Sequence, residues 1–190
     1  MARSKKLTPT LDQFLFNSPQ QKLLRFLLTE ATTTFNLRVL SSKVKNIRGI
    51  GGPEGQLEVL EELEELGLVE FLDNRKAVRL VNEHYLAPSL KSLSSVMDLE
   101  GLRPLLEPLC RRGFLFGSRA TGKNRTDSDF DIFVTGENVE EIRRVAESFP
   151  LGRDIEVVIW SEDDYEQIES KDAGLAVKLA KGIQLWGPSW

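Results

Sequence analysis

Two aspartates separated by one residue, Asp129 and Asp131, have the clearest capacity for chemistry in this sequence. They alternate with apolar residues at the start of the run Phe130 to Val134, a pattern that predicts a β-strand. Residues two apart in a strand point to the same side, so both carboxylates should project together while the apolar residues pack. Two carboxylates on one face favour the binding of a divalent cation.

A glycine and a serine precede the aspartates, at the end of another apolar run. Gly117-Ser118 follows the segment 114–116, which predicts a second strand. A glycine lets the backbone approach a phosphate closely, and a serine adds a hydroxyl donor. The pair therefore predicts a turn that holds the phosphates of a nucleotide. Three basic residues follow in the next loop: Arg119, Lys123 and Arg125. Solvated surface loops routinely carry such charges, and this interpretation of them stays open.

A third carboxylate lies in a later apolar run, 155–160, which predicts another strand. Glu156 stands there between apolar residues, where a charge needs a partner or a metal. Asp154 lies two residues earlier on the same face and is the alternative third carboxylate. Three carboxylates opposite a Gly-Ser turn are chemically suited to two-metal phosphoryl or nucleotidyl transfer.

Cysteine and histidine offer no alternative chemistry, because Cys110 and His84 are the only residues of their types. One thiol cannot form an intrachain disulfide, and one histidine cannot build a metal cluster. The single cysteine is typical of a reducing cytoplasm, and no apolar run approaches the roughly 20 residues that cross a bilayer. The basic first residues lead into no apolar signal region. We therefore expect a cytoplasmic protein with no membrane partner.

The first 88 residues predict helices followed by a hairpin. Ser18 and Pro19 start one helix, Asn36 caps a second, and Pro53 opens a third that ends at Gly67. A short helical turn over 10–16 precedes them, and strands are expected at 68–72 and 77–81. The third helix has a leucine at every third position, a pattern that predicts its buried face: Leu57, Leu60, Leu63 and Leu66.

Residues 89–190 predict a connecting helix and then alternating strands and helices. The connector occupies 89–101, and the second domain occupies 102–190. Helices are expected at 102–112, 139–149 and 165–180, and strands at 114–116, 129–134, 155–160 and 183–186. The expected fold class is α+β, with a small mixed sheet in the second domain.

The order of three helices and a hairpin in residues 1–88 resembles a winged helix-turn-helix domain, with the third helix in the recognition position. Residues 1–48 carry nine Lys and Arg against two Asp and Glu, a net charge of +7. The third helix, however, carries six glutamates and no basic residue, so it would repel DNA phosphates. This charge favours a packing or dimerisation module, including a homodimer. Basic residues nearby keep DNA binding as an alternative: Lys43, Lys45, Arg48, Arg75, Lys76 and Arg79.

The second domain resembles a known enzyme family. Gly117-Ser118, ten intervening residues, Asp129-x-Asp131 and a later acidic residue in an apolar strand are similar to the minimal nucleotidyltransferases of the polymerase-beta superfamily. The resemblance covers residues 102–187 and implies a polymerase-beta-like mixed-sheet fold.

The family implies Mg²⁺-dependent transfer of a nucleoside monophosphate, most simply AMP from ATP or another nucleoside triphosphate, to a hydroxyl of a protein or small molecule. Its roles map onto Gly117 and Ser118 for phosphates. They map onto Asp129, Asp131 and Glu156 for two metal ions.

Two residues depart from the family pattern. Thr121 stands where the family often has an arginine, so the resemblance leaves Arg119, Lys123 and Arg125 as the candidate contacts to a triphosphate. Glu156 stands where the family usually has an aspartate. The extra methylene of Glu156 shifts the third carboxylate, which predicts reduced activity and makes Asp154 a substitute.

The resemblance also implies partners. Winged helix domains are often fused to such transferases in bacteria and archaea, and some members act as antitoxins that modify a HEPN-domain partner on a hydroxyl. Two alternatives remain: a DNA-binding transcriptional regulator whose transferase domain senses nucleotide or is inactive, and an inactive interaction module.

Overall fold

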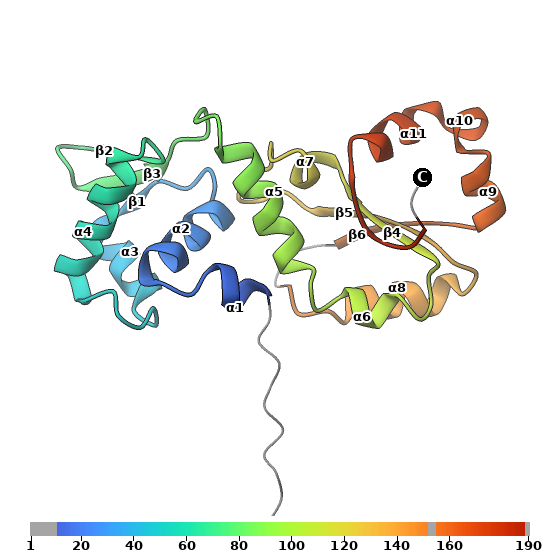
Figure 1. The fold of residues 1–190 in the computed structure, drawn as a ribbon, viewed down its shortest axis with the longest axis horizontal. Coiled ribbons are helices and arrows are strands. Elements are labelled where there is room, and N and C mark those ends of the chain that lie inside the picture. Colours follow the sequence, from blue (N-terminus) through green and yellow to red (C-terminus); the bar gives the residue numbers. More distant parts are fainter. Residues whose placement is uncertain (1–10, 152–154, 189–190) are drawn as a thin grey trace, which may run out of the picture. The chain divides into compact units, whose positions relative to one another are not determined.

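The computed structural model describes residues 11–151 and 155–188 of the chain (Figure 1). The chain divides into two compact units, Met1–Val81 and Asn82–Trp190. The helix expected as a connector is present as α5 (Ala87–Asp98), and it belongs to the second unit. None of the helices in the described ranges is long and apolar enough to cross a membrane.

Over residues 11–81, the part that the structure describes, the first unit combines four helices with a small antiparallel sheet of order β1-β3-β2. Its elements are α1 (Leu11–Leu15), α2 (Pro19–Thr29), β1 (Phe35–Asn36), α3 (Leu37–Val44), α4 (Gly52–Glu65), β2 (Val69–Leu72) and β3 (Ala77–Leu80). The expected start of α2 is confirmed: the Ser18 hydroxyl accepts from the Gln21 amide, and the Gln21 side chain accepts from the Ser18 amide. Asn36 caps α3 through a bond from the Arg38 amide.

The buried face of α4 differs from the expected leucine stripe. Leu60 and Leu63 are buried, but Leu66 is 64% exposed and Leu57 is 36% exposed. With 3.6 residues per turn, each step of three residues turns the direction by about 60°, so Leu57 and Leu66 face opposite ways. Val59 and Gln56 complete the buried face instead.

The second unit is built on a four-stranded sheet of order β6-β5-β4-β7. Strands β5 and β6 are parallel and the other pairs are antiparallel, so the sheet is mixed, as predicted. After α5 its elements are α6 (Arg103–Leu106), β4 (Arg112–Phe116), α7 (Gly117–Ala120), β5 (Phe130–Thr135), α8 (Val139–Glu147), β6 (Ile155–Trp160), α9 (Glu162–Glu166), α10 (Ile168–Lys171), α11 (Ala173–Ala180) and β7 (Ile183–Trp186).

Two predicted helices are wrong in extent. The helix expected over 102–112 is only α6, because Pro108 cannot donate a helical hydrogen bond and β4 already begins at Arg112. The helix expected over 165–180 is three short helices. Ser161 and Asp172 accept hydrogen bonds from the first turns of α9 and α11, so these polar residues start new helices.

The sheet of the second unit separates two apolar cores. Figure 1 shows α6 and α8 on one side of it and α9, α10 and α11 on the other. Phe130, Ile132 and Val134 of β5 are fully buried in the core with α6 and α8, whereas Phe133 packs with α9 and α11. Strand alternation therefore places Asp131, like Phe133, on the α11 side of the sheet.

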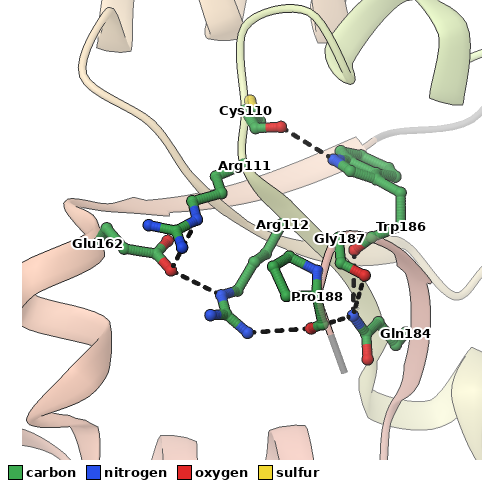
Figure 2. Close-up of polar contacts among 8 residues, drawn as sticks. All are labelled: Cys110, Arg111, Arg112, Glu162, Gln184, Trp186, Gly187 and Pro188. Carbon is green, nitrogen blue, oxygen red and sulfur yellow. Dashed lines mark hydrogen bonds and ion pairs between the residues drawn. The ribbon is translucent and has the colours of Figure 1, made fainter. Parts of the chain in front are cut away.

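Polar contacts connect the start of β4 to α9 and to the end of β7 (Figure 2). Arg112 donates from Nε to Oε1 of Glu162 at 2.7 Å and from Nη1 to the Pro188 carbonyl at 3.0 Å. The Trp186 indole donates to the Cys110 carbonyl at 3.1 Å. These bonds connect the residues at the start of β4 with α9 and with the end of β7. They lie at the opposite end of β4 from the Gly117 turn.

Candidate active site

The turn at Gly117 lies directly against the carboxylate of Asp131. Strand β4 ends at Phe116, whose register partner on β5 is Asp131. Gly117 follows with φ of +71°, a left-handed conformation that glycine adopts without steric cost. A β-carbon added to Gly117 would come within 2.1 Å of Asp131 Oδ2. Glycine is therefore required here both by backbone conformation and by space.

Hydrogen bonds within α7 and from α5 fix the shape of this turn. The Thr121 hydroxyl donates to the carbonyls of Gly117 at 3.1 Å and Ser118 at 3.3 Å. On α5, the Ser92 hydroxyl donates to the Ala120 carbonyl at 2.8 Å. Thr121, which stands where the family often has an arginine, therefore stabilises the Gly-Ser turn by bonding back to both of its carbonyls. Gly117 and Ser118 themselves stay half-buried, at the surface of the unit.

The parallel pairing of β5 and β6 brings two of the predicted carboxylates together. Asp131 and Glu156 are register partners, and both share the strand parity of residues in the α11-side core. Asp129 lies one residue before β5, two residues from Asp131. Asp131 is half-buried, whereas Asp129 and Glu156 are exposed. Asp154 lies outside the described residues, as does Thr10, the first residue of the predicted N-terminal turn.

These carboxylates influence one another electrostatically. Burial raises the pKa of Asp131, and the negative charges of Glu156 and Asp129 raise it further. The positive charges of Lys178 and Arg119 act in the opposite direction. A divalent cation would relieve the repulsion among the three carboxylates.

Lys178 acts electrostatically on Asp131, although the site residues expected from the sequence do not include it. It lies on α11, and its charge reaches Asp131 because α11 packs over the same side of the sheet. No local pattern could have found it, since the approach depends on how the helix folds back over the strands.

Arg119 is 1% exposed, and its guanidinium is directed into the protein. It donates to the Ser128 carbonyl from Nη2 at 2.6 Å and from Nε at 3.0 Å, and Nε also lies 3.1 Å from the Asp129 carbonyl. Its carbon Cζ lies 3.9 Å from the centre of the Phe130 ring. This burial does not agree with the predicted triphosphate contact, because the cation is engaged with the backbone.

The other two basic residues of the loop are exposed. Arg125 lies 3.6 Å from Asp127 in an ion pair between two highly exposed side chains. The Lys123 amide donates to the Ser118 carbonyl at 2.9 Å, while its side chain is exposed. Contact of Lys123 and Arg125 with a triphosphate stays a prediction.

The donor set fits Mg²⁺, although no preformed cage encloses it. Within 11–151 and 155–188, no three histidine, cysteine, aspartate or glutamate side chains converge closely enough to hold a metal ion. Mg²⁺ is typically held by one or two carboxylates, water and substrate phosphates rather than by a complete protein cage. The adjacent Asp131 and Glu156, with Asp129 nearby, meet that smaller requirement when a triphosphate is present.

The site thus consists of a Gly-Ser turn at the end of β4 with Asp131 and Glu156 beside it on the neighbouring strands of a mixed sheet. Residues 110–188 match the family model described as "Polymerase beta, Nucleotidyltransferase". The match supports the polymerase-beta superfamily and a nucleotidyltransferase domain in the second unit. No curated protein and no solved structure matches the chain significantly.

Proposed function

We propose that the protein is a Mg²⁺-dependent nucleotidyltransferase that moves a nucleoside monophosphate, most simply AMP from ATP, to a hydroxyl of a protein or small molecule and releases pyrophosphate. The observation that carries this proposal is the contact of the Gly117 turn with Asp131, which in turn pairs with Glu156. It joins a phosphate-binding backbone to metal-binding carboxylates within one site.

Each residue has a distinct part in this proposal. The backbone of Gly117 and the hydroxyl of Ser118 hold the phosphates of the triphosphate, and Lys178 adds positive charge from the α11 side. Asp129, Asp131 and Glu156 hold Mg²⁺. Bound Mg²⁺ neutralises charge on the triphosphate and lowers the pKa of the acceptor hydroxyl. The chain's own contribution is to hold these groups in fixed positions, which supplies most of the catalysis in phosphoryl transfer.

The reaction is tested by following the α-phosphate and the γ-phosphate of ATP separately. The protein is incubated with Mg²⁺ and cell lysate, using ATP labelled on the α-phosphate in one reaction and on the γ-phosphate in another. We expect the α-label alone to enter an acceptor, and the Asp129→Ala/Asp131→Ala variant to transfer none. Transfer of the γ-label would indicate a kinase, and equal labelling by the variant would exclude this site.

The antitoxin role is part of the same proposal and concerns the acceptor. We propose a HEPN-domain protein, modified on a hydroxyl, as one candidate partner. Co-expression with such a protein should add AMP groups that mass spectrometry detects on it. An unmodified partner under conditions where lysate proteins acquire label would contradict this acceptor.

For the first unit, we propose a winged helix module that packs or dimerises. Its support is the order α2-β1-α3-α4-β2-β3 with a three-stranded sheet. Two arginines of its hairpin are paired within the unit: Arg75 bonds Glu61 and Glu64, and Arg79 bonds Glu70. These pairs and the glutamates of α4 weigh against the DNA-binding alternative. A gel shift with promoter DNA at two salt concentrations tests it, because phosphate-driven binding falls steeply with salt.

A further inference from the structure

We propose that Arg119 is a positioning residue, which ties the Gly117 turn to the backbone that presents Asp129. The inference rests on the proposed function of this site and assigns a role within it. It concerns the coupling between the two parts of the site, the turn that holds phosphates and the carboxylates that hold metal.

The contacts of Arg119 span the loop between these two parts. Its own backbone belongs to α7, two residues after Gly117. Its guanidinium reaches across to the carbonyls of Ser128 and Asp129, the two residues that precede β5. A planar guanidinium can donate to two neighbouring carbonyls at once, which an ammonium group cannot match in the same geometry. Arg119 therefore closes the loop 120–128 at its base.

Asp129 depends on this support more than Asp131 does. Asp131 lies within the sheet, between register partners Phe116 and Glu156. Asp129 precedes the strand and its side chain is exposed, so packing does not fix it. The bond from Arg119 to the Asp129 carbonyl restrains the backbone from which that carboxylate projects.

Burial favours this role over contact with substrate. Arg119 is 1% exposed, and the ring of Phe130 lies against its guanidinium at 3.9 Å. Stacking and hydrogen bonding together hold the cation in one orientation. Moving it onto a triphosphate would break its bonds to both carbonyls and expose the buried ring.

The test measures Mn²⁺ binding by electron paramagnetic resonance in the full-length protein without nucleotide. Arg119→Lys should weaken Mn²⁺ binding roughly tenfold, as loss of support for metal ligands typically does. Arg144→Lys, an exposed arginine of α8, is the matched control and should bind as the wild type does. ATP binding in EDTA should be unchanged by Arg119→Lys, whereas a direct triphosphate contact would weaken it.

Double variants separate positioning from a general loss of structure. In an Asp129→Asn background, Arg119→Lys should cause little further loss of Mn²⁺ affinity, because the ligand that it positions is already removed. In an Asp131→Asn background the loss should persist. Equal losses in both backgrounds, or unchanged Mn²⁺ binding by Arg119→Lys, would overturn the inference while leaving the proposed function in place.

Two further measurements apply if the Arg119→Lys variant does not fold or if the wild type does not bind Mn²⁺. If Arg119→Lys does not fold by circular dichroism, Phe130→Leu replaces it, and unchanged Mn²⁺ binding by that variant would overturn the inference. If the wild type binds no Mn²⁺, the proposed metal site is wrong. The positioning role is then decided by the backbone order parameter of Asp129, which should fall in the variant without metal.

Discussion

Gly117 and Asp131 are in such close contact that residue 117 has no room for a side chain. The missing β-carbon would lie 2.1 Å from Asp131 Oδ2, and the left-handed backbone of Gly117 directs it there. The turn at Gly117, which we propose to bind phosphates, and the Asp131 carboxylate therefore occupy directly adjoining positions. A substitution at either residue should therefore displace the other.

The first prediction concerns this contact. Gly117→Ala should abolish Mg²⁺-dependent ATP binding and lower the free energy of unfolding by about 1–3 kcal/mol, the range for strained backbone. Isothermal titration and urea denaturation measure the two effects. Gly52→Ala is the matched control, because Gly52 also has φ of +71° but its β-carbon would meet no atom within 4 Å. Intact ATP binding by Gly117→Ala would contradict the assigned contact.

The second prediction concerns the third carboxylate. Glu156→Gln keeps the size of the side chain and removes its charge, so transfer of α-label from ATP should fall at least tenfold, as with other metal-site changes. Glu156→Asp keeps the charge beside Asp131 and should retain transfer. If both variants act like the wild type, Glu156 is not a metal ligand and Asp154 becomes the candidate.

The third prediction is a dependence of stability on pH through Glu162. Burial alone would raise its pKa, but the Thr135 hydroxyl and the Arg112 guanidinium hold the pKa of this carboxyl below its usual range. A carboxyl with a lowered pKa stabilises the fold above its unfolded pKa and loses this contribution as the pH falls through the folded pKa. Glu162→Gln should therefore lower the free energy of unfolding at pH 7. This loss of stability should become progressively smaller below about pH 4.3. Urea denaturation at pH 7 and pH 3.5 measures it, and an equal cost at both values would contradict the ion pair.

The fourth prediction concerns the single thiol. Cys110 is buried, and burial raises its pKa to about 11, so little reactive thiolate forms near neutral pH. Thiol labelling at pH 8 should be slow in the native protein and fast in denaturant. The labelling rate should follow the fraction unfolded across a urea titration. Rapid labelling of the native protein would show that Cys110 is accessible.

The sequence predicted the parts of the fold that depend on local alternation. The apolar residues of β5 are buried where the pattern places them, and β6 and β7 have the predicted bounds. Residue spacing placed Asp131 and Glu156 each in an apolar strand, because alternation is a local property, whereas their pairing across β5 and β6 depends on the tertiary fold. The family match to residues 110–188 supports the same interpretation of the domain.

The remaining features depend on tertiary contacts that no local pattern contains. Arg119 has the same charge as Arg125, and only the path of the loop decides that one is buried and the other exposed. Lys178 approaches Asp131 because α11 folds over the sheet. The break of the expected 165–180 helix before α11 depends on the capping bond at Asp172, which competes with helix continuation.

The most direct test of the proposed site is the binding of ATP with Mg²⁺ and with EDTA, measured by isothermal titration for the wild type and Asp131→Asn. Asparagine keeps the shape of the side chain against Gly117 but removes the charge that a cation requires. We predict that the wild type binds ATP more tightly with Mg²⁺ than with EDTA, and that with Mg²⁺ Asp131→Asn binds ATP at least tenfold more weakly than the wild type. Equal affinity of the two proteins for ATP with Mg²⁺ would contradict the proposed function.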